Sequence, residues 1–285
     1  MPLIAIMQGR LQPPQGGMFQ CFPRDGWREE FPRAVTAGLD AIEWIYDLQG
    51  ADVNPLATDS GVAEMRELGR EHKIAVVSVC ADYFMDRPFV TAAPAAFAEL
   101  AGHLVWLLGR CSLAGITRIV LPFVDASKIE TLAQQTLVVG MLRDVLPHAT
   151  RAGVELHLET SLGPEEFAAL LAQLPHPMLK ANYDSGNSSS LGYEVAAELA
   201  AYGSRIGSVH IKDRVRGGGT VPLGEGDADL PALTCGLAAI PYAGDFVLQV
   251  ARAAPGDEVA WARQNRQYLV RLLEGAHSSV LGTAR

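Results

Sequence analysis

Four side chains with metal-binding chemistry stand at or near the ends of four consecutive apolar runs in the second half of the chain. They are Glu159, Asp184, His210 and Gln249. Charged groups inside buried strands are unfavourable unless they are paired or bind a metal. Two carboxylates, one imidazole and one amide oxygen favour Mn²⁺, Mg²⁺ or Co²⁺, with Zn²⁺ as a less natural fit. We therefore expect these four residues to bind one divalent metal ion.

Other polar side chains occupy similar places. Side chains two residues apart share one face of a strand, so His157 accompanies Glu159 and Asn182 accompanies Asp184. His157 fits a buried, hydrogen-bonded core residue equally well. Lys212, which follows the seventh apolar run, and Glu159 are the expected catalytic residues. The expected substrate-binding residues are Arg10, Glu43, Asp82, His157, Asn182 and Arg252, with the two arginines as anion contacts.

The elements that would position these residues alternate between short apolar runs and longer segments with helical spacing. The predicted strands cover residues 3–7, 40–45, 74–80, 118–122, 154–158, 178–183, 206–211 and 245–250. Runs of Ile, Val and Leu are typical of parallel strands buried on both faces. We therefore predict an α/β fold, a single (β/α)₈ TIM-barrel domain over residues 1–285. The alternative, a doubly wound open sheet, calls for a glycine-rich fingerprint that residues 8–10 do not provide.

Helical spacing is clearest in residues 94–113, 129–152 and 258–274. The helix after the fifth strand is predicted to have Ser161 as its N-cap, with Pro164 in its first turn. Two long loops, residues 8–26 and 213–228, follow the first and seventh strands. In a barrel both lie at the carboxyl ends of the strands, where active sites are found. We expect them to border the substrate.

Composition narrows the class of protein. Hydrophobic residues make up 49% of the 285 residues, as in a globular protein with a large core. The formal net charge of −9 argues against a nucleic-acid-binding surface. The four cysteines form no CxxC pair, which is typical of buried residues in a reducing compartment. The apolar run at residues 1–7 is too short for a signal peptide or membrane span, so we expect a cytoplasmic protein with no membrane partner.

Several motifs resemble those of the xylose-isomerase-like TIM-barrel superfamily, in particular its sugar (phosphate) isomerase/epimerase branch, which includes ketose 3-epimerases. The motifs are Leu-His-Leu-Glu-Thr at 156–160, Asn-Tyr-Asp-Ser-Gly-Asn at 182–187, Val-His-Ile-Lys-Asp at 209–213, Val-Pro-Leu-Gly-Glu-Gly at 221–226, Met-Gln-Gly-Arg-Leu at 7–11 and Ile-Glu-Trp at 42–44. The resemblance implies a metal site of Glu, Asp, His and a second Glu. Glu159, Asp184 and His210 match the first three ligands. It also implies a homo-oligomer, a dimer or a tetramer.

The fourth ligand position departs from that pattern because it holds Gln249. In the ketose 3-epimerases the two glutamates act as bases on opposite faces of the substrate. An amide can ligate a metal through its oxygen, but it cannot accept a proton at useful pH. The sequence therefore favours chemistry with Glu159 as the base.

The resulting functional expectation is a metal-dependent isomerase or epimerase that acts on a sugar or sugar phosphate through an enediolate. One alternative is a metal-dependent lyase, such as a dehydratase of a keto-sugar or keto-inositol. Another is a sugar-binding barrel without catalytic activity. A phosphodiester hydrolase like the repair endonucleases of the superfamily is disfavoured, because those enzymes need several extra histidines and this chain is acidic.

Overall fold

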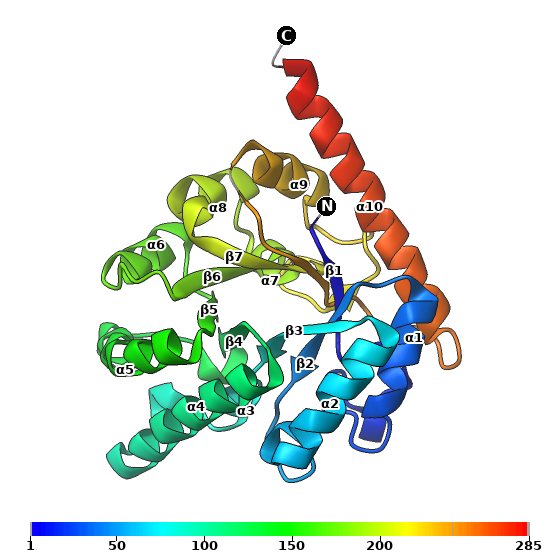
Figure 1. Cartoon of the computed structure of the whole chain (residues 1–285). Helices are drawn as coiled ribbons and strands as arrows, with labels where there is room; N and C mark the ends of the chain where they lie inside the picture. Colours follow the sequence, from blue (N-terminus) through cyan, green and yellow to red (C-terminus); the bar gives the residue numbers. More distant parts are fainter. Residues whose placement is uncertain (1, 241, 284–285) are drawn as a thin grey trace.

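The first and last strands of the main sheet pair with each other, so the sheet closes on itself. The computed structural model describes residues 2–240 and 242–283, and its barrel strands follow the order β1-β10-β7-β6-β5-β4-β3-β2. Every pairing between neighbours in the barrel is parallel, and helices surround the strands (Figure 1). The predicted single-domain (β/α)₈ TIM barrel is confirmed. The open-sheet alternative is wrong, because an open sheet would leave two unpaired edges.

Each barrel strand coincides with one of the predicted apolar runs. The strands are β1 (Ile4–Met7), β2 (Ala41–Ile45), β3 (Ala75–Cys80), β4 (Arg118–Phe123), β5 (Glu155–Thr160), β6 (Leu179–Asp184), β7 (Ile206–Ile211) and β10 (Phe246–Leu248). The last strand is shorter than the predicted run 245–250. The N–H of Gln249 nevertheless still donates to the carbonyl of Ile211 at 3.0 Å, which holds Gln249 at the end of the ladder.

Most helices surround the ring of strands, whereas α7 is seen over the middle of the ring, and α10 follows the last strand (Figure 1). The helices are α1 (Glu30–Ala37), α2 (Asp59–His72), α3 (Tyr83–Asp86), α4 (Pro94–Ala114), α5 (Leu132–Ala152), α6 (Pro164–Ala172), α7 (Ser185–Leu191), α8 (Val195–Tyr202), α9 (Leu230–Ala239) and α10 (Glu258–Thr283). Short 3₁₀ turns cover Gln15–Gly17, Trp27–Glu29, Pro55–Ala57, Phe89–Thr91, Asp125–Ser127 and Gly203–Arg205. Among the described residues, no helix combines the length and the apolar character needed to span a bilayer.

The structure corrects two predicted helix starts. Helix α5 begins at Leu132, not at residue 129, because Thr131 and Gln134 form a capping box there. The prediction that Ser161 caps helix α6 is wrong. The N-cap is Gly163 instead. Pro164 occupies the first turn of α6, as predicted. Proline suits this position because its missing N–H would have no helical partner.

The helices present apolar stripes to the barrel. Along α5 the residues Val138, Leu142, Val145 and Ala149 recur at three- and four-residue spacing, and all are buried. All of β4 is buried as well, as expected for a parallel strand covered by helices on one face and filled by side chains on the other. Burying each such aliphatic side chain contributes about 1.5–3 kcal/mol. This packing fixes the strand ends that bear the polar residues.

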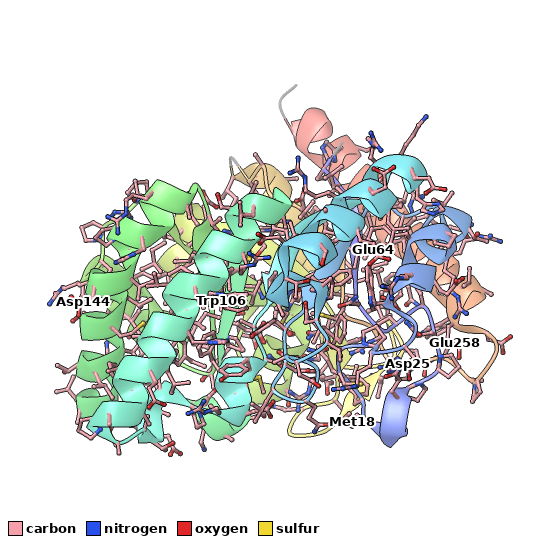
Figure 2. The ribbon with its side chains drawn as sticks, turned by 60° about the horizontal axis from the view of Figure 1, so that its bottom comes forward. Met18, Asp25, Glu64, Trp106, Asp144 and Glu258 are labelled. Atoms are coloured by element: carbon pink, nitrogen blue, oxygen red, sulfur yellow. The ribbon has the colours of Figure 1, made fainter. Side chains whose placement is uncertain are left out.

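The two long loops lie beside those strand ends. In the 8–26 loop, Arg10 donates to the carbonyl of Val250 at 3.0 Å. The 213–228 loop begins with a small antiparallel hairpin of β8 (Asp213–Arg214) and β9 (Thr220–Val221), which the sequence did not predict. Figure 2 shows Met18 at the end of the molecule where the yellow segment after β7 lies, and Met18 and Arg214 border one cavity.

Candidate active site

Glu159, Asp184 and His210 meet at the carboxyl ends of the adjacent strands β5, β6 and β7. Their ligand atoms all lie within 4.8 Å of one another, and all three side chains are buried. Nδ1 of His210 is 3.1 Å from Oε2 of Glu159 and 3.8 Å from Oδ2 of Asp184. Asp184 and His210 are register partners, so parallel pairing alone brings them side by side. The spatial cluster predicted from the sequence is therefore present.

His210 is held so that one ring nitrogen faces the two carboxylates. Its Nε2 lies 2.7 Å from Oε1 of Glu43, and Ser78 donates its hydroxyl to Oε2 of Glu43 at 2.6 Å. Glu43 and His210 are completely buried. Nδ1 of His210 has no hydrogen-bond partner in the described part of the chain. A histidine oriented by a carboxylate through one nitrogen, with the other nitrogen directed at further potential ligands, is the usual arrangement of a metal ligand.

The local charges also favour a cation. Burial by itself would lower the pKa of His210, but Glu43, Asp184 and Glu159 raise that pKa well above its ordinary value. Burial raises the pKa of Asp184, but Lys212 and His210 outweigh it and bring the pKa down to about 2. The donor set of two carboxylates and one imidazole nitrogen thus fits a divalent ion in charge and in chemistry.

Two asparagines fix Glu159. Asn182 donates to Oε2 of Glu159 at 2.9 Å, and Asn187 donates to Oε1 at 2.7 Å. The backbone N–H of Asn187 also donates to Oδ1 of Asp184, which caps helix α7. The Asp-Ser-Gly-Asn segment therefore orients two neighbouring carboxylates with one turn of helix.

Lys212 and Gln249 meet beside this cluster. Nζ of Lys212 lies 3.4 Å from Oδ2 of Asp184 and 3.3 Å from Oε1 of Gln249. The aliphatic part of Lys212 passes directly over Gly186, where a Cβ atom would stand 2.6 Å from Cγ of the lysine. The absence of a side chain at Gly186 therefore leaves room for Lys212. The amide oxygen of Gln249 and the carboxylate of Asp184 both face the ammonium group of Lys212.

A cavity of about 260 Å³ opens above these groups. It is bordered by Glu159, Lys212, Gln249, Asp82 and Gln20, among others. Hollows of about 330 Å³ and 620 Å³ lie elsewhere, the first beside α7, α8 and α9 and the second beside the amino ends of strands β1, β2 and β3. Neither of them is bordered by Glu159, Asp184 or His210. Of these three hollows, the 260 Å³ cavity is the one that Glu159 borders, together with Lys212 and Gln249, while Asp184 and His210 border none of the three.

Asp82 follows β3 and reaches the same cavity. Its Oδ2 accepts a hydrogen bond from Gln20 at 2.8 Å, and its Oδ1 lies 3.2 Å from Sγ of Cys80. Burial raises the pKa of Asp82 to about 6, although the hydrogen bonds from Gln20 and Cys80 act in the opposite direction. A carboxyl group with that pKa is able both to give and to accept a proton near neutral pH.

The remaining predicted site residues lie deeper or to the side. Glu43 contacts His210, and Asn182 contacts Glu159, so both hold the cluster from below. His157 is completely buried and does not border the cavity. Its Nδ1 lies 2.7 Å from the hydroxyl of Ser208, which in turn donates to Asn182. His157 is therefore linked to Glu159 only through two intermediate side chains.

The two predicted anion contacts hold the 8–26 loop. Arg10 donates to the carbonyl of Phe19 at 2.9 Å and to the side chain of Gln20 at 3.1 Å. Arg252 donates to the carbonyls of Phe19, Gly9 and Gln12. Neither arginine borders the cavity. Their guanidinium groups attach this loop to the end of the barrel.

Two residues of the site and one that holds the 213–228 loop were not predicted from the sequence. Gln20 connects Asp82 with Gln249, whose Nε2 donates to Oε1 of Gln20 at 3.1 Å. Asn187 belongs to the Asn-Tyr-Asp-Ser-Gly-Asn motif at 182–187, and its position three residues after Asp184, in the first helical turn, is the signal that identifies it. Asp213 is completely buried, and its carboxylate accepts hydrogen bonds from the backbone N–H groups of Gly224, Gly226 and Ala228 in the 213–228 loop. Gln20 lies in an irregular loop, where no periodic signal marks it.

A closed barrel with a carboxylate–histidine cluster at the carboxyl ends of its strands has the architecture of the TIM-barrel class, in which that end carries the functional residues. The chain belongs to the xylose isomerase-like TIM barrel family, whose model matches residues 31–272. Among curated protein sequences none matches the chain.

Several solved structures share the fold. An L-ribulose 3-epimerase has 19% sequence identity and a TM-score of 0.79, covering 100% of this chain and 99% of that one. A D-psicose 3-epimerase from Clostridium cellulolyticum H10, solved with D-tagatose, has 16% identity and a TM-score of 0.75 over 95% and 99%. A xylose isomerase-like TIM barrel protein from Mycobacterium smegmatis in complex with magnesium has 18% identity and a TM-score of 0.71 over 97% and 98%. At these identities the likeness establishes the fold.

Proposed function

We propose that the protein is a divalent-metal-dependent isomerase or epimerase of a sugar or sugar phosphate. The observation that carries this proposal is the buried cluster in which Nδ1 of His210 faces Oε2 of Glu159 at 3.1 Å and Oδ2 of Asp184 at 3.8 Å, beside a cavity large enough for a small polyol. The fold shared with L-ribulose and D-psicose 3-epimerases supports a sugar substrate. We also propose a cytoplasmic homo-oligomer, a dimer or a tetramer, with neither nucleic acid nor membrane as a partner.

The metal would be held by Glu159, Asp184 and His210, with the amide oxygen of Gln249 as fourth ligand. The donor set suits Mn²⁺, Mg²⁺ or Co²⁺, with Zn²⁺ as a further candidate. The protein from Mycobacterium smegmatis, in complex with magnesium, supports this choice of ion class. Such an ion would polarise a carbonyl and a neighbouring hydroxyl of the substrate and acidify the adjacent C–H bond.

The chain's own residues would then move the proton. Glu159, oriented by Asn182 and Asn187, removes the proton from the carbon beside the carbonyl. Lys212 brings an ammonium group to the place where negative charge develops on substrate oxygen. Asp82 borders the cavity and contacts the substrate directly in this proposal. Glu43 and His157 stabilise the site from below, and Arg10 and Arg252 shape the substrate wall by holding the 8–26 loop.

Gln249 favours one second candidate. Because an amide does not take up a proton, a site with a single base would also suit β-elimination of water from a keto-sugar or keto-inositol. Formation of a product that absorbs as an enone, with release of water, would identify this lyase activity.

Solvent-deuterium incorporation tests the proposal. The protein is loaded with Mn²⁺, Mg²⁺ or Co²⁺ and incubated in D₂O with ketoses and ketose phosphates, among them L-ribulose, D-psicose and D-tagatose. NMR should detect deuterium at the carbon beside the carbonyl for at least one substrate. The variant Glu159→Gln, which keeps the shape of the side chain, should abolish the exchange, and so should removal of the metal by a chelator. Exchange that persists in Glu159→Gln would contradict the proposal.

A further inference from the structure

With Gln249 at the fourth ligand position, the proposed epimerisation lacks a second proton carrier there. Epimerisation removes a proton from one face of a carbon and returns one to the opposite face, so it needs two proton carriers. Glu159 is one of them, and the amide of Gln249 cannot be the other. The inference that follows rests on the proposed function and concerns the identity of the second carrier.

The strand order restricts where the second carrier lies. The four expected metal ligands come from β5, β6, β7 and β10, which are consecutive in the barrel and form one half of it. A substrate bound to that half presents its other face to the half made of β1, β2, β3 and β4 and the loops that follow them. The ionisable residues from this second half that border the cavity are Cys21, Asp47, Cys80, Asp82, Asp86 and Asp125.

Most of these residues are unsuited to proton transfer. The carboxylate of Asp47 accepts the backbone N–H groups of Phe22 and Gly50, each at 2.6 Å, so the main chain of two loops holds it in place, whereas the partners of Asp82 are side chains. Asp86 and Asp125 are exposed at the rim of the cavity. The thiol of Cys80 is directed at Oδ1 of Asp82 and that of Cys21 at the carbonyl oxygen of Gln15, and burial raises the pKa of both thiols, so neither proton is available to the substrate.

We propose that Asp82 is the second proton carrier, acting on the substrate face opposite to Glu159. Asp82 stands at the start of helix α3 but makes no side-chain cap there, so its carboxyl group extends into the cavity. Its oxygens contact only the side chains of Gln20 and Cys80 among the described hydrogen bonds. The charged or ionisable groups that influence it are Arg10, Asp47, Cys80 and Glu159. The pKa of about 6 described above suits a group that alternates between acid and base.

The proposed step balances without any further reactant. Glu159, as carboxylate, takes the proton from the substrate carbon, and the electron pair of the broken C–H bond enters the enediolate. Asp82, as carboxylic acid, then gives its proton to the opposite face of the same carbon. The O–H bond of Asp82 breaks, a new C–H bond forms, and Asp82 is left as carboxylate. Exchange with water in the open cavity removes the proton from Glu159 and restores the one on Asp82.

The test separates removal of the proton from its return on the other face. Metal-loaded wild type and Asp82→Asn are incubated with the responsive ketose in D₂O, and both inverted product and deuterium in the recovered substrate are measured. We expect inversion to fall by about 100-fold to 10,000-fold in Asp82→Asn. Deuterium exchange into the recovered substrate should persist within a few-fold of wild type, because Glu159 still removes the proton and returns deuterium to the same face.

Controls make the result specific. Glu159→Gln should lose both inversion and exchange. Asp144→Asn, which alters an exposed carboxylate on helix α5 that does not border the cavity, should retain both. Asp82→Ala should give the same separation as Asp82→Asn, which makes the result independent of how the asparagine is accommodated.

Three outcomes would overturn the inference. Inversion at the wild-type rate in Asp82→Asn would exclude Asp82 while leaving the proposed function intact. Loss of both inversion and exchange, with metal affinity and melting temperature unchanged, would mean that Asp82 acts through Glu159 and carries no proton itself. A wild type that neither exchanges nor inverts any ketose would refute the proposed function, and the inference with it.

Discussion

Removing the charge of Glu43 should weaken metal binding although Glu43 would never touch the ion. Glu43 accepts the Nε2 proton of His210 at 2.7 Å, and neither side chain is exposed to solvent. In Glu43→Gln the amide oxygen still accepts that proton, so the tautomer is kept, but the charge is lost and the NH₂ group in place of Oε2 no longer accepts from the hydroxyl of Ser78. A charge-assisted hydrogen bond contributes about 1.4 kcal/mol more than a neutral one, which corresponds to a tenfold loss of affinity.

Glu43→Ala should cost more. It leaves both the Nε2 proton of His210 and the hydroxyl of Ser78 without their buried partner. The expected loss is about 100-fold, the upper end of the effect of residues that orient a metal-ligating histidine. The assay is titration with Mn²⁺ or Co²⁺ by calorimetry, checked by competition with a chelator of known affinity.

The matched control is Glu30→Gln. Glu30 is another completely buried carboxylate, but it accepts hydrogen bonds from Gly9 and Gln12 and contacts none of the expected ligands. Its substitution should leave metal affinity unchanged. If Glu43→Ala bound metal as tightly as wild type, or if Glu30→Gln weakened binding equally, the assignment of His210 as a ligand oriented by Glu43 would be wrong.

Three further predictions concern other parts of the structure. Gly186→Ala should reduce catalytic activity at least tenfold and cost about 1–3 kcal/mol of stability, because its Cβ would stand 2.6 Å from Cγ of Lys212; turnover and thermal melting measure the two effects. Asp213→Ala should make the 213–228 loop sensitive to limited proteolysis and lower stability by about 3 kcal/mol or more, because three backbone N–H groups lose a charged acceptor; a cleavage pattern identical to wild type would contradict this. Burial raises the pKa of Glu30, so the folded protein binds this proton more tightly than the unfolded chain does, and the wild type loses stability as the pH rises from the unfolded pKa to the folded pKa. The unfolding free energy of wild type minus that of Glu30→Gln should therefore fall from acid to neutral pH. A rise in this quantity would contradict the argument.

The parts of the site that the sequence predicts are those fixed by strand geometry. Asp184 and His210 end neighbouring parallel strands, so closure of the barrel places them together whatever the loops do. The same alternation correctly placed His157 on the inner face with Glu159. Alternation alone does not give depth, however. Two residues along a strand correspond to a rise of about 6.6 Å, so His157 lies below the cavity that Glu159 borders.

The parts that the sequence does not predict depend on irregular backbone. Gln20 reaches the site through a loop whose conformation is fixed by contacts with residues more than 200 positions away. The hairpin of β8 and β9 has two residues in each strand, too few to create an alternating pattern. The N-cap of α6 is not predictable in this way, because Gly163 has no side chain that could mark it. Ser161 has a hydroxyl suited to capping, but the helix does not begin there.

The attachment of the 8–26 loop to the last barrel strand has a consequence for the order of assembly. Arg10 and Gln20 find their partners at Val250 and Gln249, 240 and 229 residues further along the chain. Contacts over such sequence separations form late, because the loop that they close is long. On the ribosome the contacts of this wall with Gln249 and Val250 form only after those residues have emerged, whereas its contact with Asp82 is able to form earlier. Acquisition of substrate affinity during synthesis would therefore report the moment at which the ring of strands closes.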